Sequence, residues 1–359
     1  MEFGLSEEQI MLQESVDRFL QDTSPLDRVR ELAEDGAAHD DTIWQGMAEL
    51  GVTGLLVPEH YGGLGMSLLD AMLVQEMLGR YVSPVAFTAT SVLAAIALTR
   101  SENESLKQQY LPAIADGSLQ AAVALSEQTG VRSGAGLSIS NGKLSGNVLF
   151  ALGAPNATAL LIGGPDNLLY LIESSANGIE RQSLRSIDDT QVMAEYRFSD
   201  TPAQLVSSDT ELVGKLVDAG RVMLAADTLG AAQHMLEKAV EYAKERKQFN
   251  RVIGSFQAVK HMCAEMAAGL EPCRSLVWYA AHAFDAIPEE SRLTACHAKA
   301  HLSEVGRFVA RTSTEVHGGM GFTDLMGLHY WFKRIGFNRQ LLGSPERARE
   351  DAAKAQGWI

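Results

Sequence analysis

The chain alternates between two patterns of hydrophobic and polar positions. Over residues 1–119 apolar side chains recur at spacings of three and four, which predicts packed helices; an example is the set Leu12, Val16, Phe19 and Leu20. Residues 120–207 instead contain short runs of Val, Leu, Ile and Tyr, separated by Asn-Gly, Gly-Gly and Pro-Asp pairs typical of turns. Helical spacing returns over residues 208–359. We therefore predict an N-terminal helical domain, a β domain and a C-terminal helical bundle with these boundaries.

Capping and turn residues refine this outline. Ser6 suits the start of a helix over residues 5–35, and Ser67 suits the start of a helix in SLLDAMLVQEMLGR. The segment SISNGKLSG predicts a hairpin, because Asn-Gly accepts positive φ at both turn positions. In the C-terminal part the pattern predicts four helices, over residues 211–245, 255–286, 290–318 and 325–352.

Composition excludes several classes of protein. Hydrophobic residues make up 46% and charged residues 21% of the 359-residue chain, as in a globular rather than a disordered protein. A net charge of −15 argues against a general nucleic-acid or anionic-membrane binder. No apolar run is long enough to span a bilayer, and the acidic N-terminus lacks a signal-peptide core.

The three cysteines form no Cys-x-x-Cys motif and lie in helical patterns. They predict buried free thiols in a reducing cytoplasm rather than disulfides or a metal site.

The segment 218–260 combines two kinds of sequence. Its first part has an apolar stripe at helical spacing that includes Val222, Leu229, Leu236 and Ala239, and it ends in the cationic turn ERKQF. A short link, RVIGSF, leads to a second helix that opens with QAVKHMC. Taken alone, this pattern is that of bundle core with a solvated basic end.

Several motifs, in order along nearly the whole chain, resemble the acyl-CoA dehydrogenase family. FGLSEEQ, VPEHYGGLGMS and QEMLGR are similar to parts of its helical domain, and ALSEQTGVRSG stands where the family has a loop at the start of its β domain. ERKQFNRVIGSFQ resembles the family's flavin motif, and EVHGGMGF resembles its Gln-x-x-Gly-Gly-x-Gly-Phe motif. The resemblance implies a mainly α fold with a central β domain: an N-terminal helical domain, a small antiparallel β-barrel and a C-terminal four-helix bundle.

The resemblance also implies FAD as cofactor, bound between subunits. A pyrophosphate is suited by a cation and by backbone N–H groups near a helix start, and glycines let a backbone approach it closely. The cofactor-binding residues that the resemblance implies are Arg246, Phe249, Phe256, Gln257, Glu315, Val316, His317, Gly318, Gly319 and, from the β-domain loop, Ser126. Without the family resemblance, Arg246 is equally well explained as the solvated end of a helix. Gly318-Gly319 is then explained as a helix break. Glu315 stands where the family commonly has Gln, and a negative charge beside a pyrophosphate is unfavourable unless neutralised.

The implied reaction is α,β-dehydrogenation of an acyl-CoA, in which a carboxylate removes the α-proton and the flavin accepts a hydride. The chain departs from the family at both positions where that carboxylate is found. The turn position is Leu342, and the position on the helix that opens the bundle is Gly220. Asp218 and Arg221 of the same helix motif remain, and the resemblance implies that they hold acyl-CoA. Arg221 is equally suited to a buried ion pair.

Asp227 is the remaining candidate for the catalytic base. It lies seven residues after Gly220, roughly 10 Å along the helix and on nearly the same face. A charge in the apolar run MLAADTLGAA is costly unless it is used or paired. The alternative is a structural Asp paired with an Arg or Lys of the bundle.

Two functions follow as expectations. The first is an acyl-CoA dehydrogenase that passes electrons to an electron-transfer flavoprotein and resembles members for steroid side chains or bulky acyl groups. It would be a homotetramer or an α2β2 heterotetramer with a related chain. The second is a non-catalytic subunit that lends Arg246 and Gln257 to a partner's FAD. Another flavin reaction on the same fold, such as that of an oxidase or monooxygenase component, is favoured by nothing in the sequence.

Overall fold

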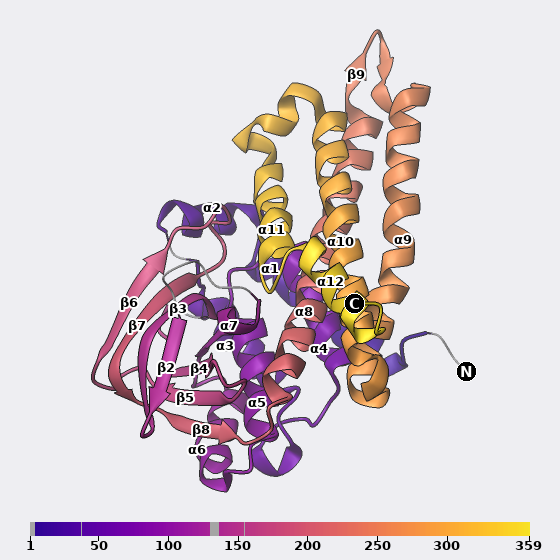
Figure 1. Ribbon diagram of the computed structural model, residues 1–359. Coiled ribbons are helices and arrows are strands. Elements are labelled where there is room, and N and C mark those ends of the chain that lie inside the picture. Colours follow the sequence, from indigo (N-terminus) through magenta and orange to yellow (C-terminus); the bar gives the residue numbers. More distant parts are fainter. Residues whose placement is uncertain (1–3, 37, 130–135, 154) are drawn as a thin grey trace.

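A computed structural model describes residues 4–36, 38–129, 136–153 and 155–359. Helices surround a long central helix, and a β-sheet lies against one side of them (Figure 1). The first helices run in the order α1 (Glu7–Thr23), α2 (Leu26–Glu34), α3 (Asp41–Glu49), α4 (Leu68–Arg80), a π-helical segment (Thr88–Ala94), α5 (Ala95–Thr99) and α6 (Glu104–Ala115).

Both predicted N-caps are confirmed. The hydroxyl of Ser6 accepts a hydrogen bond from the Gln9 backbone N–H, and the Gln9 side chain accepts one from the Ser6 N–H. Ser67 begins α4 in the same reciprocal way with Asp70. The single helix predicted over residues 5–35 is wrong, because the chain breaks at Pro25, whose ring cannot continue the preceding turn.

The β domain holds one eight-stranded sheet. Its pairing order is β6-β7-β3-β1-β4-β5-β8, with β2 on β3, and every pair is antiparallel except the parallel pair β1–β4. The predicted hairpin at Asn141-Gly142 is confirmed, with φ of 51° and 71°. The elements are β1 (Ala121–Ala124), α7 (Ser126–Thr129), β2 (Gly136–Ser140), β3 (Lys143–Gly153), β4 (Ala159–Gly163), β5 (Leu169–Glu173), β6 (Ile179–Leu184), β7 (Met193–Pro202) and β8 (Gln204–Ser207).

Alternation along the strands gives this sheet two buried faces. In β1, Ala121 and Val123 belong to the large core shared with the helices, whereas Ala122 and Ala124 belong to a second core inside the β domain. The second core includes Tyr196 and other buried side chains of β3 and β7. The sheet therefore both encloses a core of its own and packs against the helices.

The C-terminal part contains α8 (Leu212–Glu245), the small hairpin of β9 (Lys247–Gln248) and β10 (Arg251–Val252), α9 (Gln257–Ala286), α10 (Pro288–His317), α11 (Leu328–Gln340) and α12 (Pro345–Ala355). The helix predicted over residues 325–352 is wrong, because a turn separates α11 from α12. Leu342 and Gly343 have φ of 56° and 99° there, and Pro345 opens α12. Leu342 sits in this left-handed region although its side chain disfavours it.

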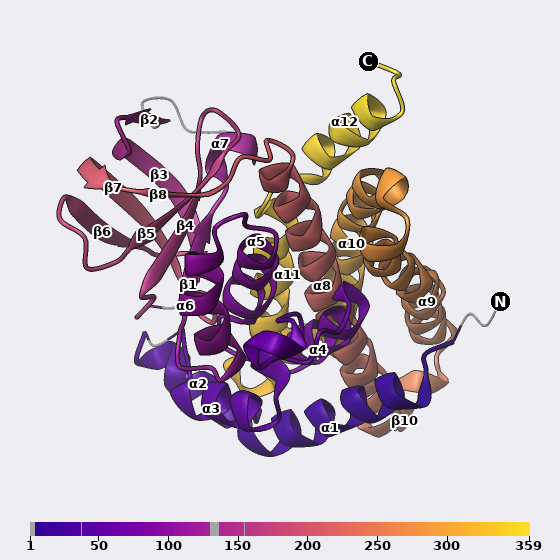
Figure 2. The same ribbon diagram turned by 90° about the horizontal axis from the view of Figure 1, so that it is seen from below.

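Helix α8 is the centre of the molecule. It contacts α4 on one side and α10 on the other (Figure 2). It approaches α4 closely because of two glycines: a Cβ at Gly230 would overlap the carbonyl oxygen of Glu76, and one at Gly79 would overlap that of Asp227. The chain from Leu212 to Leu236 is almost entirely buried. The polar residues of this stretch must therefore find partners within the protein.

None of the helices described is long and apolar enough to cross a membrane. Within the same residues, no group of three or more His, Cys, Asp or Glu side chains is arranged to hold a metal ion. The three cysteines are free thiols; Cys273 and Cys296 are buried, and Cys263 is partly exposed.

Candidate active site

An apolar pocket of about 340 Å³ lies between the sheet and the C-terminal helices. Its size is within the range of small-molecule sites. The lining residues are mostly large and apolar, and Thr129, Ser186 and Gln340 are its polar members; the apolar ones are Leu93, Val123, Leu125, Leu149, Phe150, Leu152, Ile187, Met193, Phe337, Leu341 and Leu342, with Gly336. None of these lining residues is charged. The pocket therefore suits an uncharged aromatic or aliphatic group.

Segments singled out in the sequence meet at this pocket. Leu125 and Thr129 belong to the segment ALSEQTGVRSG, which resembles the family's β-domain loop, and Leu342 is the turn position at which the family has a carboxylate. The side chain of Ser126, and residues 130–135 of that loop, lie outside the part of the chain that the structure describes. Sequence reasoning thus found the loop after β1 and the turn between α11 and α12. It did not predict Gln340 or Ser186 as residues of the pocket.

The two positions without a carboxylate touch each other. A Cβ on Gly220 would overlap Cδ1 of Leu342 and would lie 3.7 Å from Cδ2 of Leu93. Leu342 therefore occupies the space that a side chain at position 220 would need. As a result, this end of the pocket is closed by a leucine, where the family resemblance leads one to expect a glutamate.

Arg221 and Asp218 are both buried in ion pairs within the chain. Arg221 is 1% exposed; its guanidinium lies 2.6 Å from Asp351 and donates to the Leu342 carbonyl oxygen at 3.1 Å. Asp218 lies 2.6 Å from Arg292. Burial raises the pKa of Asp218, and the nearby Arg292 and Arg221 only partly offset it. In this structure the two residues connect α8 to α10 and α12, and neither lines the apolar pocket.

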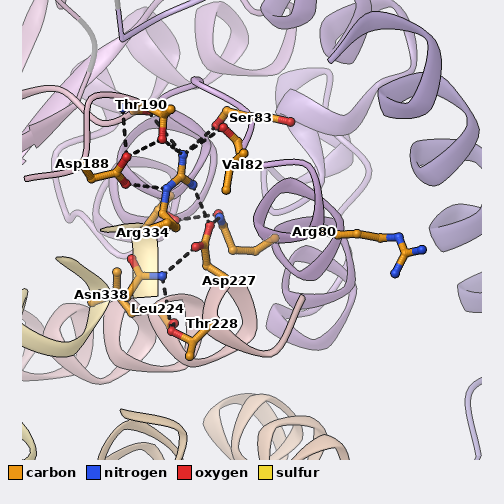
Figure 3. A network of polar contacts seen from close by, with 12 residues as sticks. Arg80, Val82, Ser83, Asp188, Thr190, Leu224, Asp227, Thr228, Arg334 and Asn338 are labelled. Carbon is orange, nitrogen blue, oxygen red and sulfur yellow. Dashed lines mark hydrogen bonds and ion pairs between the residues drawn. The ribbon is translucent and has the colours of Figure 1, made fainter. Parts of the chain in front are cut away.

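Asp227 is also fully engaged (Figure 3). Its Oδ2 accepts hydrogen bonds from Gln75 at 2.7 Å and from Arg334 at 3.0 Å, and its Oδ1 accepts one from Asn338 at 2.6 Å. The residue is 2% exposed. This is the buried ion pair with a bundle arginine that the sequence left open as the alternative to a base. Both carboxylate oxygens are therefore occupied by donors from the same chain.

Arg334 on α11 organises this network. Its Nε donates to Asp188 at 2.6 Å, and its Nη2 donates to Thr190 Oγ1 at 2.6 Å and to the carbonyl oxygens of Val82 and Ser83 (Figure 3). Burial lowers the pKa of this guanidinium, but Asp188 and Asp227 outweigh that effect and raise it. Sequence reasoning missed Arg334; α11 also carries Lys333 and Arg339, so its pattern does not single out the charge that is buried.

A narrow cavity of about 20 Å³ borders Asp227, together with Gln75, Thr88 and Asn338. That volume holds about one water molecule. Leu152 and Phe337 line both this cavity and the apolar pocket. Asp227 is thus close to the pocket without lining it.

The predicted cofactor edge lies at the far end of α8, in the β9–β10 hairpin that projects beyond the helices (Figure 1). Phe249, at its tip, is 88% exposed, and Arg246 and Gln257 are exposed as well. Phe249 meets Phe256 edge to face with centroids 6.1 Å apart, and the guanidinium of Arg251 lies 3.9 Å from the Phe256 ring centre. This edge presents cations and aromatic rings, the groups that a pyrophosphate and a flat ring system require.

The second flavin motif is split between surface and interior. Gly318 and Gly319 are exposed, with open space where a Cβ would be, so a ligand could approach their backbone closely. Glu315 is exposed 3.7 Å from Arg311. Val316 and His317 are buried; His317 Nδ1 lies 2.8 Å from the Ser313 carbonyl oxygen, and burial lowers the pKa of its ring. None of the exposed members of the two motifs lines the apolar pocket of the same chain.

A helical domain, a β-sheet domain and a second helical domain around an apolar pocket define the fold class of the acyl-CoA dehydrogenases. Residues 6–118 match the N-terminal domain of this family and residues 210–357 match its C-terminal domain. The chain belongs to the acyl-CoA dehydrogenase family, whose members are FAD-dependent oxidoreductases acting on CH–CH groups.

Three similar proteins illustrate this relationship. The chain is 29% identical to the acyl-CoA dehydrogenase IpdE2 of Mycobacterium tuberculosis over 342 residues, which cover 94% of each protein. It superimposes on the structure of the Tcur3481-Tcur3483 steroid ACAD G363A variant with a TM-score of 0.88 and 27% identity, covering 98% of both chains. It shares the fold of the ChsE4-ChsE5 complex of Mycobacterium tuberculosis, with a TM-score of 0.90, 24% identity and full coverage of both chains.

Proposed function

We propose that this protein takes part in the FAD-dependent α,β-dehydrogenation of an acyl-CoA as one chain of an α2β2 complex with a related acyl-CoA dehydrogenase chain. The partner chain supplies the carboxylate base, and electrons pass to an electron-transfer flavoprotein. The observation that carries the proposal is the Gly220–Leu342 contact, because an apolar side chain fills the place where the base is expected. The described lining of the pocket contains no carboxylate.

The residues available fit the cofactor. FAD combines a flat ring system with a pyrophosphate, and when bound it supplies the acceptor for the hydride. The aromatic rings of Phe249 and Phe256 suit the ring system, while Arg246, Gln257 and the open backbone at Gly318 and Gly319 suit the pyrophosphate and its neighbours across a subunit boundary. A chain of this kind can lend its exposed edge to a partner's cofactor although its own pocket lacks a base.

One similar structure supports the heteromeric arrangement and the kind of substrate. The similar structure named for Tcur3481 and Tcur3483 is described as a steroid ACAD, and its name joins two proteins. An uncharged, ring-containing acyl group suits a pocket whose described lining is mostly apolar and carries no charge. We therefore place the protein in steroid or fatty-acid catabolism in the cytoplasm, where its free thiols would stay reduced.

The proposal is tested by purification with and without a related chain. We expect the chain alone to bind little FAD and to reduce none of it with acyl-CoA, and the co-expressed complex to be yellow, to bleach anaerobically with acyl-CoA and to reduce electron-transfer flavoprotein. A yellow single chain that acyl-CoA bleaches would contradict the subunit role.

A second candidate is a dehydrogenase that uses Asp227 as its own base. It is favoured by one observation, namely that the Asp227 cavity and the pocket share Leu152 and Phe337 as walls. Rotation of Phe337 would join the two spaces. Asp227→Asn in a competent complex decides the matter: unchanged flavin reduction removes Asp227 as the base, whereas a loss of at least 1,000-fold with normal folding supports it. Asn338→Ala, which removes one donor to Asp227 and leaves the carboxylate, is the matched control.

A further inference from the structure

One face of α10 carries a hollow that is lined by this helix alone. Arg307, Phe308, Arg311 and Glu315 are exposed at spacings of three and four residues, so they lie on the same side of the helix. The hollow among them has a volume of about 320 Å³ and is lined by Glu304, Arg307, Phe308, Arg311, Thr312 and Glu315. Other sides of α10 contact α8, α9, α11 and α12. Among the described residues, the lining of this hollow includes none from those helices.

The floor of the α10 hollow is partly apolar. Phe308 is 39% exposed, and Thr312 beside it is buried. A partner that covers the Phe308 ring would remove this apolar surface from water, which favours association.

The charges around the α10 hollow are unequally paired. Glu304 accepts a hydrogen bond from Arg339 at 3.2 Å, and Glu315 lies 3.7 Å from Arg311. Arg307 makes no hydrogen bond or ion pair within the part of the chain that the structure describes. The hollow therefore suits an occupant that brings a carboxylate together with an apolar side chain.

The α10 hollow adjoins the region that the proposed function places at a subunit boundary. Glu315, at one end of the hollow, lies one turn before the exposed Gly318 and Gly319. This end of α10 lies at the same end of the helices as the β9–β10 hairpin (Figure 1). From Glu304 to Glu315 the hollow follows the helix for about 16 Å. A chain that contacts the glycines can therefore continue along α10.

The charges distinguish two possible occupants, a second copy of this chain and a related chain. In a symmetric contact between two copies, the same patch lies against itself. With the hollow at its centre, Arg307 and Arg311 of each copy would face the arginines of the other, and like charges brought together oppose association. A related chain with carboxylates at the facing positions meets no such repulsion.

We propose that the α10 hollow is a docking surface for the related chain of the complex and that it selects this chain over a second copy. The partner presents carboxylates to Arg307 and Arg311 and an apolar side chain to Phe308. The inference rests on the proposed function, because the occupant is the related acyl-CoA dehydrogenase chain of that complex.

The test supplies the missing carboxylates on a copy of this chain. The double variant Arg307→Glu/Arg311→Glu is mixed with the wild type, and association is measured by sedimentation velocity. We expect the mixture to associate at least about tenfold more tightly than either chain alone at about 50 mM salt, and to lose at least about tenfold of that affinity at about 500 mM. Phe308→Asp in the wild-type chain should abolish this association, because a charge replaces the apolar floor.

Controls at other faces separate this surface from general effects of charge. Arg181→Glu/Arg197→Glu reverses two exposed arginines of β6 and β7, and it should not associate with the wild type. Leu50→Asp, at a leucine that is 45% exposed at the end of α3, is the control for Phe308→Asp and should leave the association unchanged. If the double variant does not fold, Arg307→Glu alone reverses the cation without a partner and takes its place.

Two results would overturn the inference. Self-association of the wild type that Phe308→Asp removes would show that the α10 hollow pairs with itself. A mixture that associates no more tightly than the wild type alone would show that the arginines do not select a partner.

The co-expressed complex separates this inference from the proposed function. There the double variant Arg307→Glu/Arg311→Glu should lower the amount of related chain that co-purifies at least about tenfold. A double variant that keeps its partner, and whose flavin acyl-CoA still bleaches, overturns the inference and leaves the proposed function intact. A wild-type chain whose flavin acyl-CoA bleaches without any partner refutes the proposed function, and the mixing experiment still judges the hollow.

Discussion

The two ends of helix α8 use charged residues in opposite ways. In the first half, Asp218, Arg221 and Asp227 are buried and each is held by an ion pair with a residue of α10, α11 or α12. At the other end, Arg246 is exposed, and its side chain makes no hydrogen bond or ion pair within the part of the chain that the structure describes. The same helix thus contributes charges to the fold at one end, and at the other end we propose that it offers a cation to a ligand. The buried charges already have partners within the chain, whereas the role of the exposed cation stays a prediction.

The largest test of this contrast is at Arg334. Arg334→Met leaves Asp188 and Asp227 buried without their counter-charge, and we expect the free energy of unfolding to fall by about 3–5 kcal/mol. Lys333→Met is the matched control on the neighbouring residue, because Lys333 pairs with Asp189 in partial contact with solvent and should cost at most about 1 kcal/mol. Urea unfolding of both variants measures the difference; equal losses would contradict the buried-network interpretation.

The next effect concerns the close crossing of α8 and α4. Gly230→Ala places a Cβ against the backbone of Glu76, and we expect it to destabilise the protein by about 2–3 kcal/mol through forced separation of the two helices. Gly269→Ala on α9, where the nearest atom would be Val305 Cγ1 at 3.9 Å, should instead be neutral or stabilising by up to about 1 kcal/mol. Thermal unfolding of the pair checks this, and similar stability of the two variants would show that the crossing tolerates a methyl group.

A smaller, pH-dependent effect comes from His234 on α8, which stacks on Trp331 with ring centroids 4.4 Å apart. Burial, aided by nearby Arg80 and Lys238, lowers the pKa of His234 to about 3. Below pH 6.5 the unfolded chain takes up a proton that the folded chain does not, so this residue makes stability fall as the pH falls from about 6.5 towards 3.

His234→Phe keeps the stacked ring and removes this dependence. Relative to the wild type it should gain about 2 kcal/mol between pH 7 and pH 5, measured by urea unfolding at each pH. His301→Phe, at an exposed position of α10, serves as the control and should follow the wild type. A parallel pH profile for His234→Phe and the wild type would show that His234 becomes protonated in the fold.

The smallest change in stability is expected at the exposed end. Arg246→Ala should alter the free energy of unfolding by no more than about 0.5 kcal/mol. In the complex with a partner chain, however, it should lower FAD content severalfold, because a cation beside the pyrophosphate is lost. The FAD content of Arg246→Ala is compared with that of Arg251→Ala, which removes a cation from the β9–β10 hairpin. If Arg246→Ala leaves the FAD content unchanged, Arg246 is not part of the cofactor edge.

Local signals in the sequence were enough for much of the fold. Ser6, Ser67 and the Asn141-Gly142 pair each determine a cap or turn by hydrogen bonds within a few residues, so they could be predicted. The turn at Leu342 could not, because its left-handed φ is disfavoured for leucine and is held by Arg221, 121 residues away.

For the site, the sequence indicated that Asp227 is either a catalytic base or part of a buried ion pair. It did not indicate which of the two is correct. The ion-pair partner of Asp227, Arg334, lies 107 residues away, and Arg334 meets Asp188 at a separation of 146 residues. Pairings of this range leave no periodic trace in the sequence. The roles of Arg246, Gln257 and Gly318-Gly319 at a cofactor stay predictions, since their proposed ligand belongs to a neighbouring chain.

The contacts of Arg334 have a consequence for how the chain folds. This guanidinium can be buried only when the end of α4, the loop before β7 and the middle of α8 have all arrived, since each supplies one of its acceptors. Until then its desolvation is uncompensated. The network of Arg334 therefore couples the stability of these three parts, since separating any one of them leaves a buried group unpaired.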